Sequence, residues 1–176
     1  VVTWGQFGGD SSEVSEDLQS GVVDIFSTDL AFAALKEDGS LIVWGDSGSL
    51  GGMESIRHEL QSGVVSFATT DFKFSATKQD GRIIFWGGTS NGGDSTMVNF
   101  HLRGQVKSIA SNFFSFAALK EDGSIYTWGG GPRNNPSLSL QNTLAQGGFQ
   151  SIVGNHSAYT AIHADGSAIS WGDPAS

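Results

Sequence analysis

Short apolar runs separated by polar turns recur along the chain in groups of three. In the first group, Val22–Phe26 is rich in β-branched residues, Ala31–Leu35 combines small and aromatic residues, and Ser40–Trp44 is β-branched again. Such runs, bounded by turn residues, are typical of short β-strands. Counterparts of the first run lie around Val65, Ile109 and Ile152. The pattern therefore predicts three strands in each of four units.

An Asp-Gly pair separates the second and third runs of every unit. These pairs are Asp38-Gly39, Asp80-Gly81, Asp122-Gly123 and Asp165-Gly166. Asp-Gly supplies the positive φ values that a tight hairpin turn needs. We therefore expect the second and third strands to be antiparallel, with a hairpin turn at each Asp-Gly.

The units repeat at a nearly fixed period. All five tryptophans precede glycine, at Trp4, Trp44, Trp86, Trp128 and Trp171, with spacings of 40, 42, 42 and 43 residues. Aromatic residues (Phe32, Phe74, Phe116, Tyr159) and leucines (Leu18, Leu60, Leu102, Leu144) keep the same phase. A constant period indicates one copied supersecondary unit. We predict a single repeat domain over 1–176, with repeats at about 4–43, 44–85, 86–127 and 128–170 and an extra strand at 1–3. We also expect the five tryptophans to be largely buried in the core.

The segment between units has weak helical signals. Residues 11–18 begin with serines and place acids in the first turn, and 53–60 has Ile56 and Leu60 four apart. Both features favour one or two helical turns. Residues 95–102 and 137–144 are weaker versions. An irregular loop that closes on a buried leucine is the alternative.

The string Ala-Leu-Lys-Glu-Asp-Gly-Ser-x-x-x-Trp-Gly occurs at 34–45 and again at 118–129. It resembles the repeat of the regulator of chromosome condensation family, and the resemblance covers nearly the whole chain. That family builds β-propellers, usually of seven blades, so the resemblance implies that each repeat is a blade or most of one. The Gly-Gln-Leu-Gly that usually follows Trp-Gly in the family is absent here. Four units would form either a small closed propeller or an open arc, which would belong to a longer polypeptide or be completed by a partner. Terminal repeats of an open array are normally polar caps, and neither end of this sequence has a distinct one. An open arc or a fragment of a longer propeller is favoured.

Charge and composition exclude several functions. The chain has 18 acidic and 9 basic residues, a net charge of −9, and no cysteine. Nucleic-acid binding requires a basic face, so no nucleic-acid partner is expected. No apolar run reaches the length of a transmembrane helix, so direct membrane insertion is not expected. The absence of thiols is compatible with the cytoplasm or an organelle interior, and the compartment stays unknown.

No group of residues predicts catalysis or a bound metal. Gly45–Ser49 resembles the nucleophile segment of chymotrypsin-like proteases, but no histidine lies in the supporting context. The Gly-Gly-Asp-Ser segments at 8–11 and 92–95 suggest calcium only weakly, because a loop entering a helix explains them equally well. The four histidines lack ligand spacing. We therefore predict no enzyme activity, no catalytic residue, no cofactor and no metal.

The variable loops after Trp-Gly are the predicted binding surface, because binding residues concentrate on loops of a rigid scaffold. These loops are 6–13, 46–54, 88–96 and 130–138. Residues 4–43 carry eight acids and only one base, Lys36, so a basic or mixed-charge protein partner is expected. The candidate contact residues are Phe7, Asp10, Glu13, Glu16, Asp17, Leu50, Met53, Arg57 and Arg133.

Three functions compete on this basis. A protein–protein interaction or scaffold module is favoured, as part of a larger propeller protein or as a peripheral subunit of a larger assembly, organellar and membrane-bound assemblies included. The family resemblance implies guanine-nucleotide exchange or association with a ubiquitin ligase as the alternative. A hydrolase or lectin-like enzyme comes third, because no convergent acid–base pair is visible.

Overall fold

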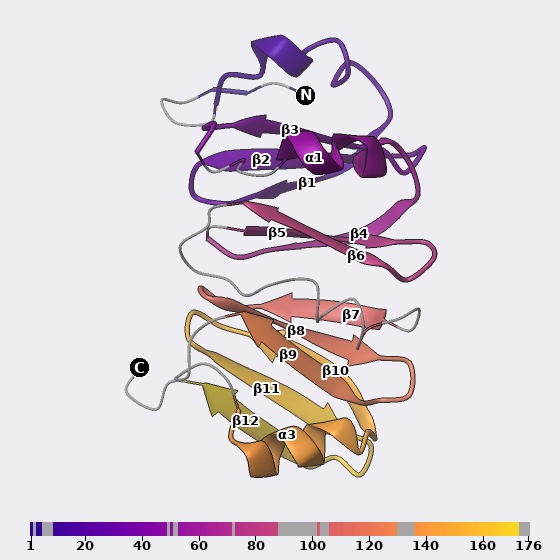
Figure 1. Cartoon of the computed structure of the whole chain (residues 1–176), viewed down its shortest axis with the longest axis vertical. Helices are drawn as coiled ribbons and strands as arrows, with labels where there is room; N and C mark the ends of the chain where they lie inside the picture. Colours follow the sequence, from indigo (N-terminus) through magenta and orange to yellow (C-terminus); the bar gives the residue numbers. More distant parts are fainter. Residues whose placement is uncertain are drawn as a thin grey trace. The chain divides into compact units, whose positions relative to one another are not determined.

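The chain folds into four three-stranded antiparallel sheets, whose strands are labelled in Figure 1. The structure is a computed structural model that describes residues 1, 3–4, 9–48, 50, 53–71, 73–87, 102, 106–129 and 136–172. Each sheet contains three consecutive strands with the middle strand in the centre. The strands are β1 (Val22–Ser27), β2 (Ala31–Lys36), β3 (Leu41–Gly45), β4 (Val64–Thr69), β5 (Lys73–Lys78), β6 (Ile83–Gly87), β7 (Val106–Ser111), β8 (Ser115–Lys120), β9 (Ile125–Gly129), β10 (Phe149–Gly154), β11 (Ala158–His163) and β12 (Ala168–Gly172). The all-β repeat fold predicted from the sequence is confirmed.

The chain divides into two compact units. The first unit comprises Val1–Asp80 and Ile84–Thr89, and the second comprises Gly81–Ile83 and Ser90–Ser176. Within the first unit β1 lies beside β4, and within the second unit β7 lies beside β10. Neighbouring sheets of a unit therefore approach through their first strands. The single repeat domain over 1–176 stays a prediction.

The Asp-Gly hairpins are three-residue loops in which only the glycine has a positive φ. In the first sheet the Lys36 N–H donates to the Ser40 carbonyl at 2.9 Å, and the Gly39 N–H donates to the Lys36 carbonyl at 2.9 Å. Gly39 has a φ of 76°, and no described residue other than glycine has a positive φ. The turn is therefore followed by a left-handed glycine and a bulge. The expected hairpins are present, but Asp38 contributes its carboxylate, which accepts from the Ser40 N–H and hydroxyl, and not a positive φ.

The connecting segments that the structure describes contain short helices. The first contains the 3₁₀ helix η1 (Ser12–Val14), and the second contains α1 (Met53–Ile56) followed by the 3₁₀ helix η2 (Arg57–Gln61). The fourth contains α3 (Leu138–Ala145), whose first turn is capped by the Ser137 hydroxyl accepting from the Leu140 N–H at 3.3 Å. Of the third connector, 95–102, the structure describes only Leu102. The four repeated leucines are buried, with 1–2 % of their surface exposed.

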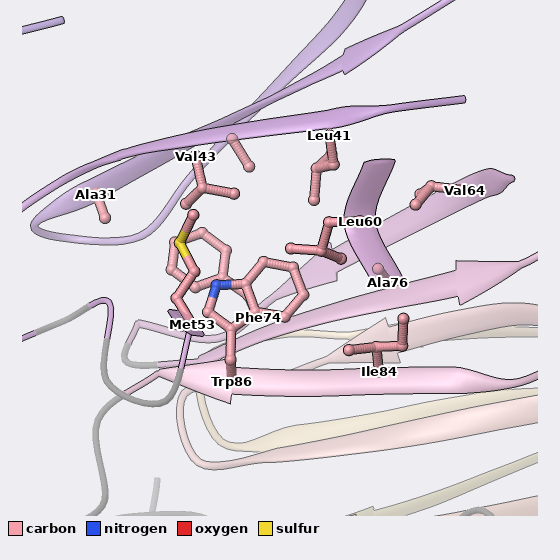
Figure 2. Close-up of a cluster of buried hydrophobic side chains, with 11 residues drawn as sticks. Ala31, Leu41, Val43, Met53, Leu60, Val64, Phe74, Ala76, Ile84 and Trp86 are labelled. Carbon is pink, nitrogen blue, oxygen red and sulfur yellow. The ribbon is translucent and has the colours of Figure 1, made fainter. Parts of the chain in front are cut away.

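Each unit has a core between its two sheets, and the connector lies in that core. In the first unit, Met53 and Leu60 of the connector lie between Leu41 and Val43 of β3 and the rings of Phe74 and Trp86 (Figure 2). In the second unit, Leu144 of α3 packs with residues from β8 and β9 on one side and β10, β11 and β12 on the other. A helical connector therefore fills the space between neighbouring sheets and joins them through apolar contact.

Four of the five tryptophans are buried, and Trp4 is not. Trp44, Trp86, Trp128 and Trp171 are 4–7 % exposed, and each stacks on the repeated aromatic of the middle strand with ring centroids 5.2–5.5 Å apart. Trp4 is 83 % exposed. The expectation of five buried tryptophans was wrong for Trp4, because among the described residues no second strand pairs with residues 3–4 and offers it a ring.

Candidate functional surfaces

The described part of the loop after Trp44 turns back onto the core of the first unit. The Leu50 N–H donates to the Asp46 carbonyl at 3.1 Å, and the Met53 N–H donates to the Leu50 carbonyl at 3.0 Å. These bonds wind the loop so that Met53 enters the core and Leu50 packs against it half-buried. Both candidate residues therefore stabilise the loop from inside. Phe7 and Arg133, two further loop candidates, lie outside the described residues.

Arg57 is exposed and weakly held. Its guanidinium contacts the Glu54 carboxylate at 3.1 Å, and the two side chains are 59 % and 86 % exposed. A surface ion pair three residues apart on a helix contributes only about 0.2–0.5 kcal/mol. Arg57 is therefore able to exchange this partner for another carboxylate.

The acidic segment, residues 10–17, lies on the surface of the first repeat. Leu18 anchors it beneath Trp44 and Ala34, whereas Asp10, Glu13, Glu16 and Asp17 are exposed. The Lys36 ammonium donates to the backbone carbonyl of Asp17 at 2.6 Å. Within the described part of the chain, no ion pair involves the carboxylates of Glu13, Glu16 or Asp17. This segment therefore presents negative charge to solvent.

Asp10 is bound locally at the start of the same segment. Its carboxylate accepts hydrogen bonds from the Ser12 hydroxyl and from the Ser12 N–H. These bonds, the hydroxyl first, hold the pKa of Asp10 below its usual value. Asp10 therefore stays ionised over the physiological range and adds to the negative surface.

The other polar residues that the sequence singled out form no site. Gly45, Asp46, Ser47 and Gly48 of the protease-like string form part of the loop above, where Asp46 accepts from the Gly48 N–H at 3.0 Å. His156 packs on the ring of Phe113 at 4.8 Å, and His163 contacts Asp165 at 3.2 Å beside a hairpin turn. Among the residues that the structure describes, no three His, Asp or Glu side chains are placed to hold a metal ion. The same residues contain no helix long and apolar enough to cross a membrane.

A groove in the second unit is a feature that the sequence analysis missed. It has a volume of about 510 Å³ and is lined by Ile125–Trp128 of β9 and by Gln141, Asn142, Leu144 and Ala145 of α3. All these residues are uncharged. Its volume falls within the range of about 300–1,000 Å³ that is usual for ligand sites. We name it the β9–α3 groove.

The strand β9 is more polar before its tryptophan than its counterparts in the first two repeats. In the first two repeats the positions before the tryptophan are apolar, Ile42-Val43 and Ile84-Phe85, whereas the third repeat has Tyr126-Thr127. Tyr126 is half-buried at the groove, and this burial raises the pKa of its hydroxyl. The fourth repeat also has a polar residue, Ser170, at the position of Thr127, so this difference alone does not identify the groove.

Solved β-propellers resemble this structure. Prp20p from Saccharomyces cerevisiae shares 17 % identity with a TM-score of 0.63, over 92 % of this chain and 46 % of Prp20p. The CRINKLY WD40 ectodomain of the Arabidopsis thaliana receptor kinase ACR4 shares 17 % identity with a TM-score of 0.60, over 88 % of this chain and 52 % of that one. Human WBSCR16 shares 16 % identity with a TM-score of 0.56, over 86 % of this chain and 47 % of WBSCR16.

The comparisons define the fold and no further identity. No protein-family model matches the sequence, and no curated protein sequence matches it. The chain spans about half the length of the solved structures named above. At 16–17 % identity the likeness concerns the backbone arrangement, so the chain has a β-propeller repeat fold.

Proposed function

We propose that this chain is a non-catalytic protein-binding module whose acidic segment meets a basic or mixed-charge surface of its partner. The observation that carries the proposal is the arrangement of residues 10–18. Leu18 holds the segment on the core, and the carboxylates of Glu13, Glu16 and Asp17 point to solvent without an ion pair among the described residues. Exposed charge of one sign accelerates encounter with a complementary surface and contributes specificity.

The related folds support a protein partner. Yeast RCC1 (Prp20) has been solved bound to Kap60, and the structure of Prp20p was reported with its binding properties to Gsp1p and histones. The repeated aromatics of the present chain, by contrast, are used in its cores. Binding therefore falls to side chains outside the cores, and the acidic segment, Arg57 and the candidates Phe7 and Arg133 are the residues to test.

The test compares two triple variants with the same change of charge. One is Glu13→Gln, Glu16→Gln and Asp17→Asn, and the control is Asp24→Asn, Asp29→Asn and Glu37→Gln, three exposed acids of the same repeat. A partner captured with the wild-type chain is purified, and its association rate is measured at low and high salt. We expect the first variant to bind about tenfold more slowly at low salt and the control to bind like the wild type.

Two results would contradict the proposal. Equal association rates for both variants at low salt would remove the role of the acidic segment. Turnover of a substrate by the purified chain, abolished by a single substitution outside the cores, would show that the chain is an enzyme.

A further inference from the structure

The strand β9 is an edge strand on the side of its sheet away from the neighbouring sheet. The third sheet has the order β7-β8-β9, and β7 lies beside β10 of the fourth sheet. The Lys107 ammonium reinforces that junction by donating to the Gln150 carbonyl at 3.2 Å. Within the described part of the chain, β9 pairs with β8 alone. Its other edge therefore carries backbone groups that the sheet does not use.

The register identifies these backbone groups. The Lys120 N–H donates to the Ser124 carbonyl at 2.8 Å, and Ala118 pairs with Tyr126 as Phe116 pairs with Trp128. In an antiparallel ladder, hydrogen-bonded and non-hydrogen-bonded pairs alternate. Tyr126 and Trp128 therefore direct their N–H and C=O groups at β8. Ile125 and Thr127 direct theirs away from β8.

Helix α3 forms the opposite wall of the β9–α3 groove. Gln141, Asn142 and Ala145 are exposed on α3, and Leu144 anchors the helix in the core. The Gln141 amide donates to the Pro136 carbonyl at 2.9 Å, which holds that side chain beside the helix start. The groove therefore has one wall of unused strand backbone and one wall of uncharged helical side chains.

We propose that an extended, uncharged segment of a partner protein binds in the β9–α3 groove and adds to β9 as a fourth strand. Outward N–H and C=O groups at alternate residues repeat every 6–7 Å along a strand, a spacing that an extended peptide matches and a compact ligand does not. Main-chain hydrogen bonds to Ile125 and Thr127 provide affinity. The uncharged lining excludes charged side chains, because they would lose hydration without gaining a partner.

This inference rests on the proposed protein-binding function but uses a different surface. The acidic segment belongs to the first unit and the groove to the second. A variant with Glu13, Glu16 and Asp17 neutralised is therefore expected to bind a groove peptide like the wild type. Failure of either proposal is in this way distinguishable from failure of the other.

The first experiment measures amide hydrogen exchange by NMR on the full, ¹⁵N-labelled chain. The probe is a pool of blocked hexapeptides built from Ala, Val, Ser, Thr, Gln and Tyr, added at about 1 mM. Strand addition is expected to slow exchange at Ile125 and Thr127 at least tenfold and to leave Tyr126 and Trp128, already bonded to β8, unchanged. The same pool with every backbone amide N-methylated, which cannot donate from either edge, is expected to lose the effect.

The second experiment compares matched variants. Thr127→Pro removes an outward N–H without breaking the ladder to β8, and Ser170→Pro does the same at the corresponding position of β12. Asn142→Arg places a charge in the groove, and Ser139→Arg places the same charge on an exposed α3 position outside it. Thr127→Pro and Asn142→Arg are expected to weaken binding at least tenfold, and their controls to retain it. Far-ultraviolet circular dichroism shows that each variant is folded.

Three outcomes would overturn the proposal. One is the absence of slowed exchange at Ile125 and Thr127 with the peptide pool. Another is equal binding of the N-methylated pool. The third is a set of NMR chemical-shift changes confined to Gln141 and Asn142. This result would indicate a ligand held by side chains, and titration with a neutral sugar would identify such a role.

Discussion

The backbone N–H of Phe149 donates a 3.0 Å hydrogen bond to the carbonyl of Gly123, tying the fourth sheet to the hairpin turn of the third. The first unit repeats this link, because the Val64 N–H donates to the Gly39 carbonyl at 2.9 Å. The turn glycine thus closes a hairpin, and its carbonyl also accepts a hydrogen bond from the first strand of the next sheet in the same unit. This double role leaves no room for a side chain.

Substitution of Gly123 by alanine should therefore be costlier than the same change at Gly166. Both glycines have a positive φ, 77° and 87°, which costs an alanine about 1–2 kcal/mol. A Cβ at Gly123 would also lie 2.7 Å from the Gly148 nitrogen, whereas a Cβ at Gly166 meets nothing within 4 Å. We expect Gly123→Ala to lower the free energy of unfolding by about 1–3 kcal/mol more than Gly166→Ala. Equal losses in urea denaturation would show that the turn does not hold the next sheet.

The tryptophans differ in what they stabilise. Trp86 is 5 % exposed and stacks on Phe74 at 5.2 Å, whereas Trp4 is 83 % exposed. We expect Trp86→Ala to cost about 3–5 kcal/mol and Trp4→Ala to stay within about 0.5 kcal/mol. Thermal or urea unfolding of both variants measures this contrast. A large loss for Trp4→Ala would mean that its ring is covered in solution.

Tyr159 should titrate far later than Tyr126. The Tyr159 hydroxyl donates to the Ser115 carbonyl at 2.6 Å inside the second core, and burial raises its pKa well above the usual value of 10.0. A raised pKa favours the folded state below about pH 10, and this contribution is lost as the pH rises further. Absorbance at alkaline pH should show a late tyrosine ionisation in the wild type that coincides with its unfolding. The Tyr159→Phe variant should lack this late ionisation. An early ionisation of both tyrosines would contradict the buried hydroxyl.

The hairpin aspartates should make the fold sensitive to acid. The Ser167 hydroxyl and then the Ser167 N–H lower the pKa of Asp165 from 3.8 to about 2, and His163 adds a smaller effect. A lowered pKa contributes stability above the usual value, and this contribution is lost as the pH falls from about 4 to about 2. We expect Asp165→Asn, which keeps an acceptor but does not ionise, and Ser167→Ala to reduce the fall of Tm between these pH values. An unchanged slope in both variants would exclude this source of acid sensitivity.

The sequence predicts the strands well because the residues that determine each strand and turn lie close together along the chain. The Asp-Gly pairs, the apolar runs and the repeated leucines each act within a few residues, and all appear as expected in the described part of the chain. Trp4 was mispredicted because the same dipeptide is buried only where a middle strand supplies an aromatic partner. The burial of Met53 depends on a loop that winds back between two sheets. The β9–α3 groove depends on how far α3 lies from β9, a spacing that no pattern along the chain encodes.

The order of strands has a consequence for how the molecule forms. Every sheet consists of three consecutive strands, so its pairings join residues close in sequence. Such short-range contacts form quickly, because little chain entropy is lost before they are made. Each sheet is therefore able to form as soon as its own residues leave the ribosome. Within each unit, the helical connector between the two sheets then packs on the first sheet and becomes part of the surface against which the second sheet packs.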